Sequence, residues 1–236
     1  MSDAGLSILF ESQHIVVVDK PVGIATEPDK DGAESLRDRL GALLISRGGG
    51  KRRPPHAVSR LDTNVSGAVT FAISDLGAQK AAAAQQHGHI VRRYVAICAP
   101  LAETEGRWTS PVQGKPAASR FKRVAAAGGR AALLVLEPET GRTHQLRIHA
   151  SGAGAPIFGD GRYGGKTSLA DSAGRVQRVD RVLLHSMAVR VSFGLPADPP
   201  GFVVAPIPAA LLDVWQVLDG AAEAWNDVAS LYSGTF

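Results

Sequence analysis

The chain is poor in cysteine and in aromatic residues. It has 236 residues with one cysteine, Cys98, and Phe, Trp and Tyr together make up 6%. A single cysteine cannot form an internal disulfide, which suits a reducing compartment, and it also excludes zinc ribbons. Cys98 lies in an apolar run that starts at Tyr94, so a buried structural thiol is expected rather than a nucleophile.

Long apolar runs are also missing. Residues 15–18 are apolar, but charged residues end this run far short of the roughly 20 residues that a membrane helix needs. Residues 1–5 lack the basic start and apolar core of a secretory signal. These absences predict a cytoplasmic protein without a membrane contact.

The charge is mildly basic and unevenly placed. Lys and Arg number 26 against 22 Asp and Glu, and the isoelectric point is near 9.5. Basic residues gather in the middle of the chain, at positions 51–53, 92–93, 120–123, 142 and 147. Phosphate backbones favour such clusters through counterion release, although a solvated surface explains any single cluster equally well.

Periodicity and turn signals predict an α+β fold with a mixed, largely antiparallel sheet and flanking helices. Strands are expected at residues 6–10, 15–20, 68–73, 119–125, 131–137, 181–184 and 188–193. Helices are expected around residues 36–44, from an N-cap at Ser74 to residue 86, and at 208–218. Residues 48–55 and 167–179 are expected to be surface loops. A single domain, residues 1–236 with a core at about 6–218, accounts for the chain.

Three segments together carry the functional signal. They are DKPVG at residues 19–23, SRLDTNVSG at 59–67 and TGRTHQLRIH at 140–149. In this order they resemble the RluA-type family of pseudouridine synthases, whose motifs read K-P-x-G, H-R-L-D-x-x-T-S-G and G-R-T-H-Q-[IL]-R-x-H. RYVA at 93–96, PIFGDGRYG at 156–164 and LHS at 184–186 extend the resemblance. It implies a cofactor-independent isomerase that turns a uridine of rRNA or tRNA into pseudouridine.

The reaction breaks the bond between C1′ of the ribose and N1 of the base and rejoins the base through C5. A carboxylate near C1′ suits this chemistry, either as a nucleophile or by stabilising the cationic sugar, and removal of the C2′ proton is a further possibility. The resemblance assigns this carboxylate to Asp62. Taken alone, Asp62 would be interpreted as a turn residue, because Asp-Thr-Asn precedes Ser-Gly.

The resemblance also implies roles for three residues around the target nucleotide. Arg60 would fill the space that a flipped-out nucleotide leaves in the RNA, and Tyr94 would lie against the uracil ring. Arg147 is the expected partner of Asp62, because a neighbouring guanidinium keeps a carboxylate ionised and orients it.

Four other residues are expected to contact RNA or to shape the cleft: Lys20, Arg93, Arg142 and His144. As single residues, Arg142 and His144 would be interpreted as surface residues, and Lys20 could be purely structural.

The chain departs from the family pattern in two places, since Ser59 replaces the usual His and Val65 the usual Thr. An S4-type RNA-binding domain, common in the family, is not expected before the first strand. Because of Ser59, a noncatalytic RNA-binding protein with the synthase fold stays open as an alternative. A glycosidase that pairs Asp62 with Glu137 or Glu139 is a weaker one.

Metal and nucleotide sites are not predicted. The histidines give no metal-ligand spacing, and residues 160–167 lack the first glycine of a phosphate-binding loop. The expected partner is structured RNA, without a metal or cofactor, and a monomer is expected.

Overall fold

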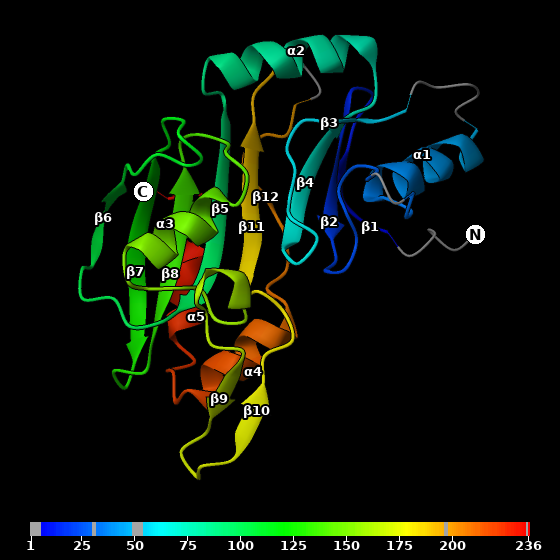
Figure 1. The fold of residues 1–236 in the computed structure, drawn as a ribbon. Helices are drawn as coiled ribbons and strands as arrows, with labels where there is room; N and C mark the ends of the chain where they lie inside the picture. Colours follow the sequence, from blue (N-terminus) through cyan, green and yellow to red (C-terminus); the bar gives the residue numbers. More distant parts are fainter. Residues whose placement is uncertain (1–5, 30–31, 49–53, 196–197, 235) are drawn as a thin grey trace. The chain divides into compact units, whose positions relative to one another are not determined.

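The computed structural model describes residues 6–29, 32–48, 54–195, 198–234 and 236 (Figure 1). The chain folds into two compact units. Unit 1 comprises residues Met1–Val91 and Ala188–Ala205, and unit 2 comprises Arg92–Met187 and Pro206–Phe236. Strand β11 (Leu184–Val191) contributes its first half to unit 2 and its second half to unit 1.

Unit 1 is built on antiparallel strand pairs. Its elements are β1 (Ser7–Glu11), β2 (Ile15–Lys20), α1 (Leu36–Ser46), β3 (His56–Ala57), β4 (Ser66–Ala72), α2 (Asp75–Gln86) and β12 (Val203–Val204). Strand β2 pairs with β1 on one side and with β4 on the other, β3 pairs with β4, and β12 with β11. The strands predicted at residues 6–10 and 15–20 are therefore confirmed, and they form an antiparallel pair.

The core of unit 1 forms because β2 is apolar on both faces. Its first four residues are all fully buried, at 0% exposure. Ile15 and Val17 belong to a buried cluster that also contains Ala81 and Ala84 of α2. Helix α2 begins as predicted, since the Ser74 hydroxyl accepts a hydrogen bond from the Gly77 N–H at 3.0 Å. This packing gives the loops at the strand ends a fixed support.

Unit 2 contains the longest strands. Its elements are β5 (Ile90–Cys98, whose first two residues belong to unit 1), β6 (Glu105–Trp108), β7 (Ser119–Ala127), β8 (Ala131–Pro138), α3 (Gln145–Gly152), the 3-10 turn η1 (Gly161–Tyr163), β9 (Ser168–Ala170), β10 (Val176–Arg178), α4 (Ala209–Val217) and α5 (Ala224–Ser230). Antiparallel pairing gives the strand order β5-β8-β7-β6, and β9 and β10 form a separate two-stranded ribbon. The predicted α+β class with a largely antiparallel sheet is confirmed.

Helices cover both faces of this sheet. Ser119 and Arg120 are neighbours on β7, so their side chains point to opposite faces. Ser119 contacts Gln145 and His149 of α3, whereas Arg120 contacts the last residue, Phe236, beyond α5. Consistent with two covered faces, the first six residues of β8 are all buried.

Several element predictions were wrong. Two strands were expected at residues 181–184 and 188–193, but the structure has the single strand β11 over Leu184–Val191. His185 and Ser186, each 1% exposed, continue it without a break. The expected loop at 167–179 contains β9 and β10, whereas β3, β6, α3 and α5 were not predicted at all. Part of the expected loop at 48–55 lies outside the described residues. Within the described part of the chain, no helix is long and apolar enough to cross a membrane.

Helix α1 offers a test of local stability. The Ser35 hydroxyl accepts from the Asp38 N–H at 3.2 Å, and the Asp38 carboxylate accepts from the Ser35 N–H at 3.0 Å and from its hydroxyl at 2.7 Å. These hydrogen bonds lower the pKa of Asp38 from its ordinary value. Substituting Ser35→Ala is expected to lower the free energy of unfolding by about 1 kcal/mol in urea denaturation at pH 7.

The loss should shrink as the pH falls below roughly 4, because protonated Asp38 accepts these bonds poorly and its lowered pKa stabilises the fold only while it is ionised. The control is Ser46→Ala. Among the described residues, the Ser46 hydroxyl donates to the Leu43 carbonyl, at the other end of α1. Equal losses in the two variants would contradict the capping role of Ser35.

Candidate active site

Asp62 lies in the loop between β3 and β4, and Thr26 fixes the backbone just before it. The Thr26 hydroxyl accepts from the Leu61 N–H at 3.0 Å and donates to the Leu61 carbonyl at 2.9 Å. Thr26 is 3% exposed, so both bonds are shielded from water. The Asp62 carbonyl accepts from the Val65 N–H at 3.0 Å, which closes the turn. The Asp62 side chain itself is only partly buried.

Residues 20–24 fix the backbone that follows this aspartate. The Thr63 carbonyl accepts from the Gly23 N–H at 2.8 Å and from the Lys20 ammonium at 3.3 Å. The same ammonium donates to the carbonyls of Pro21 at 2.9 Å and Ile24 at 2.8 Å. Lys20 was predicted to contact RNA or to be structural; it is fully buried at 0% exposure and binds backbone carbonyls. Its observed role is to hold the loop.

The other residues of this motif divide between the surface and the interior. Arg60 is exposed, as a residue that enters an RNA helix must be. Ser59 and Val65, where the chain departs from the family pattern, are buried at 8% and 2% exposure. The two departures therefore change side chains on the inner side of the loop and leave Arg60 on its outer side.

In unit 2, Arg147 of α3 forms a buried ion pair with Asp160. Its Nε donates to Oδ2 at 2.6 Å and its Nη2 donates to Oδ1 at 2.8 Å. The guanidinium carbon lies 5.0 Å from the centre of the Tyr163 ring. The Tyr163 hydroxyl is 2.8 Å from Nδ1 of His144, which lies just before α3. The sequence did not predict Asp160 as a partner of Arg147. The predicted partner was Asp62, a residue of unit 1, and that pairing stays a prediction.

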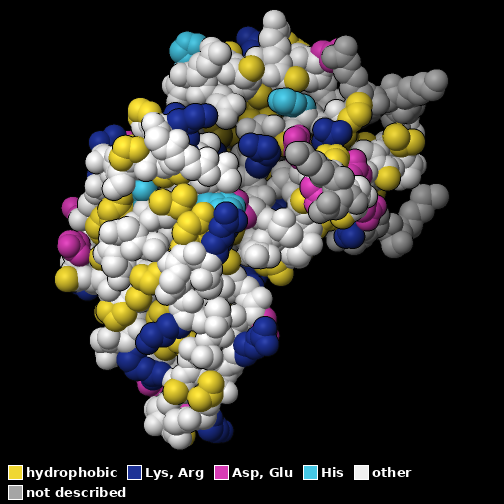
Figure 2. All heavy atoms as spheres, viewed as in Figure 1, with side chains coloured by type: hydrophobic (Ala, Val, Ile, Leu, Met, Phe, Trp, Pro, Cys, Tyr) yellow, Lys and Arg dark blue, Asp and Glu magenta, His cyan; other side chains and the backbone are white. Residues whose placement is uncertain are grey.

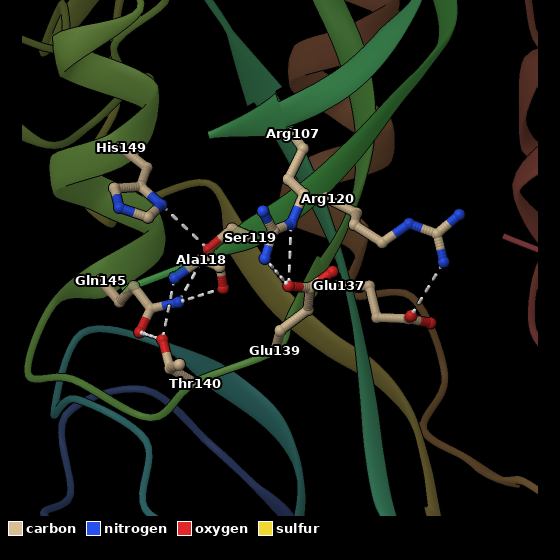
Figure 3. A network of polar contacts seen from close by, with 9 residues as sticks. All are labelled: Arg107, Ala118, Ser119, Arg120, Glu137, Glu139, Thr140, Gln145 and His149. Atoms are coloured by element: carbon tan, nitrogen blue, oxygen red, sulfur yellow. Dashed lines mark hydrogen bonds and ion pairs between the residues drawn. The ribbon is translucent and has the colours of Figure 1, made fainter. Parts of the chain in front are cut away.

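Gln145 anchors the start of α3 to the sheet (Figure 3). Its side-chain oxygen accepts from the Thr140 hydroxyl at 2.6 Å and from the Arg142 N–H at 3.0 Å. Its amide nitrogen donates to the Ala118 carbonyl and the Ser119 hydroxyl, both at 2.8 Å. These four bonds fix the turn that leads from β8 into α3. The Arg142 side chain is exposed and reaches back over the loop before β7.

His149, one helical turn beyond Gln145, gives α3 a second attachment. Its Nδ1 is 3.0 Å from the Ser119 hydroxyl, and its Nε2 is 2.9 Å from the Ser110 carbonyl (Figure 3). Only 2% of His149 is exposed. Helix α3 is thus tied to the sheet on both sides of Arg147.

Arg93 and Tyr94 are neighbours on β5 and point to opposite faces of the unit 2 sheet. Arg93 was predicted to contact RNA, but it is 6% exposed, and its Nε lies 3.0 Å from the Glu137 carboxylate. Its Nη1 donates to the Leu231 carbonyl at 2.8 Å, so it ties the segment after α5 to the sheet. Tyr94, paired with Leu136, therefore lies on the face that carries α3. Tyr94 is 6% exposed.

Unit 2 also carries exposed cations. Figure 2 shows Lys and Arg side chains, in dark blue, around the end that carries β9 and β10 in Figure 1. The exposed basic residues of this segment are Arg162, Lys166, Arg175 and Arg178. Arg175 and Arg178 pair with neighbouring aspartates, but exposed ion pairs of this kind contribute little and exchange readily for other anions.

The structure also shows whether the lone cysteine is a structural thiol or a nucleophile. Cys98 is buried at 0% exposure, as predicted, and burial raises the pKa of its thiol. This disfavours the thiolate that a nucleophile needs. Among the described residues, no group of three or more His, Cys, Asp or Glu side chains could hold a metal ion.

Sequence reasoning missed the residues that position the predicted ones. They are Thr26, Gln145, Asp160 and Tyr163. Asp160 and Tyr163 lie in a segment whose family likeness was noted without a role, and Gln145 lies inside the third motif. Thr26 carried no signal, because it acts on a loop 35 residues away.

Comparison with known proteins defines the class to which this arrangement belongs. Residues 14–152, which include both the Asp62 loop and Arg147, match the RNA pseudouridylate synthase family. The chain belongs to this family of isomerases, and the resemblance to RluA-type synthases is confirmed.

Individual relatives support the assignment. The chain is 34% identical to "Uncharacterized RNA pseudouridine synthase YhcT" of Bacillus subtilis, over 82% of this chain and 70% of that protein. It is 30% identical to "Ribosomal large subunit pseudouridine synthase D" of Xanthomonas campestris, over 92% of this chain and 70% of that protein. The solved structure of "Human RNA Pseudouridylate Synthase Domain Containing 4" has the same fold, with a TM-score of 0.72 and 22% identity over 90% of this chain and 92% of that chain.

The Thr26 anchor can be tested by Thr26→Val, which keeps the shape and removes the hydroxyl. The Leu61 N–H and carbonyl then lose their buried partner, so the free energy of unfolding should fall by about 1–3 kcal/mol in urea denaturation. Hydrogen exchange of residues 59–65 should become faster. The matched control is Thr70→Val, because the buried Thr70 hydroxyl has no hydrogen-bond partner among the described residues. If Thr70→Val costs as much as Thr26→Val, the anchor is not what stabilises the loop.

The Gln145 network can be tested by Gln145→Glu. The substitution keeps the size of the side chain but sets a carboxylate oxygen against the Ala118 carbonyl, so a donor is replaced by a repelling acceptor. Thermal and urea denaturation should show a loss of about 1–3 kcal/mol. Gln177→Glu, on the exposed strand β10, is the control and should change stability by less than about 0.5 kcal/mol. A stability of Gln145→Glu equal to the wild type would argue against the network.

Proposed function

We propose that this protein converts a specific uridine of a structured RNA, rRNA or tRNA, into pseudouridine, with Asp62 as the essential carboxylate. The observation that carries the proposal is the construction of the Asp62 loop. Buried anchors hold the backbone on both sides of the residue, while its side chain stays partly exposed. Such rigidity suits a group that must meet one atom of a bound substrate.

In the proposed reaction the bond between N1 and C1′ breaks and a bond between C5 and C1′ forms. The proton on C5 leaves the base, and N1 gains a proton, so that atoms balance without a cofactor. Asp62 acts either on C1′ or on the C2′ proton. Tyr94 supports the uracil ring, its hydroxyl lying near the departing C5 proton.

Access to the target base requires that the nucleotide leave the RNA stack. Arg60 is exposed and planar, which suits a side chain that occupies the vacated space. Exposed cations of unit 2, with Arg142 and His144, would bind phosphates of the same RNA. Two relatives described above support an RNA substrate, and the name of one of them mentions the ribosomal large subunit. Large-subunit rRNA is therefore the first RNA to test, and tRNA the second, in a cytoplasmic location.

Release of tritium from RNA labelled at C5 of uridine measures the reaction directly. Wild-type protein should release tritium from one or a few sites, and Asp62→Asn should lower the rate by about 1000-fold or more, because an amide cannot act as a carboxylate. Asp213→Asn, on the exposed side of α4, is the control and should keep the full rate.

Three other outcomes of this experiment would contradict parts of the proposal. RNA binding by the wild type without tritium release would favour the noncatalytic RNA-binding protein. Free uracil among the products would favour a hydrolase, since an isomerase releases none. Retained tritium release by Asp62→Asn would refute the role of Asp62.

A further inference from the structure

Asp160 is among the most deeply buried carboxylates that the structure describes, and the proposed reaction gives it no role. Its exposure is 1%, although isolated carboxylates are rarely taken so far from water. Both of its oxygens accept from Arg147, at 2.6 and 2.8 Å. A bidentate pair of this kind compensates the desolvation of both charges and fixes the plane of the guanidinium.

Hydrogen bonds and close packing fix the backbone of the turn that carries Asp160. The Gly165 N–H donates to the Asp160 carbonyl at 2.8 Å, and the Tyr163 N–H donates to it at 3.1 Å. A Cβ atom on Gly165 would meet the Ile157 carbonyl at 1.8 Å, and one on Gly159 would meet the Arg181 carbonyl at 1.7 Å. Only glycine fits at these two positions, because the turn packs closely against the backbone of Ile157 and Arg181.

Tyr163 and His144 complete the support of the guanidinium. The Tyr163 ring lies 5.0 Å from the guanidinium carbon, a cation–π distance. His144 holds the Tyr163 hydroxyl at 2.8 Å and has a left-handed backbone, with φ of 56°, just before α3. Arg147 is therefore held by a carboxylate at one edge and by an aromatic ring.

The guanidinium edge that binds Asp160 determines which N–H groups of Arg147 can donate hydrogen bonds to a second group. A guanidinium can bind carboxylates through the pair Nε and Nη2 or through the pair Nη1 and Nη2. Asp160 takes the first edge, which directs the Nη1 side away from Asp160. Because Asp160 also balances the charge of Arg147, the pair contributes directed hydrogen bonds more than net charge.

We propose that Asp160 is a positioning residue, which acts through Arg147 by fixing the direction in which its Nη1 edge donates hydrogen bonds. The inference rests on the proposed function and on the sequence prediction that Arg147 orients Asp62. It assigns Tyr163 a supporting part in the same task. Loss of Asp160 would let the guanidinium turn about its side-chain bonds, and a misplacement of about 1 Å can cost on the order of 100-fold in rate.

The test is the single-turnover rate of tritium release at saturating excess of enzyme, where the rate constant does not depend on the fraction of active protein. Asp160→Asn should lower this rate by about 10- to 100-fold, while the affinity for the RNA changes by less than about 3-fold. In an Arg147→Gln background, Asp160→Asn should have little further effect, because its target is already lost.

The control is Glu137→Gln, which disrupts the pair of Arg93 and Glu137, a second buried arginine–carboxylate pair of unit 2. Its side-chain exposures are 7% and 15%, against 7% and 1% for Arg147 and Asp160. It should lower stability but leave the single-turnover rate within about 3-fold of wild type. If Asp160→Asn does not fold, Tyr163→Leu removes the ring beside the guanidinium and should lower the rate by on the order of 3- to 10-fold.

Two results would overturn the inference. One is a single-turnover rate of Asp160→Asn, or of Tyr163→Leu in its place, within about 3-fold of wild type. The other is an equal effect of Asp160→Asn with and without Arg147. If Asp62→Asn is inactive while Asp160→Asn is not impaired, the inference fails and the proposed function stands. If Asp62→Asn keeps its activity, the role of Asp62 in the proposed function fails, and the inference, which rests on that role, fails with it.

Discussion

The pair formed by Arg147 and Asp160 is the constraint on which the architecture of unit 2 depends. Two charges can be buried only if each satisfies the other, which demands that α3 and the turn at Asp160 keep a fixed separation. Gln145 and His149 hold α3 in place through their hydrogen bonds to Ser119 of the sheet. The close-packed glycines, Gly159 and Gly165, hold the turn at Asp160 in place.

Unit 1 solves a related problem with hydrogen bonds from side chains to the backbone of a loop. The loop that carries Asp62 has no regular secondary structure, and its own hydrogen bond, from the Val65 N–H to the Asp62 carbonyl, closes a single turn. A hydroxyl from Thr26 and an ammonium from Lys20 supply the missing partners from another part of the chain. In both units, then, groups with no part in the chemistry position those that the proposed reaction uses.

The sequence predicted features that depend on local patterns and missed those that depend on distant contacts. The hairpin of β1 and β2 and the N-cap at Ser74 follow from neighbouring residues and are confirmed. Strand β11 was split in two because His185 looks like an interruption until its burial is known. Motifs also cannot separate a buried cation from an exposed one, which is why Lys20 and Arg93 were expected to contact RNA.

The central claim is that this protein makes pseudouridine in a cellular RNA. The direct measurement is a map of pseudouridine across total RNA from cells with and without the gene. We expect one or a few uridines, in rRNA first, to lose the modification without the gene and to regain it with the wild-type chain but not with Asp62→Asn. An identical map in all strains would contradict it.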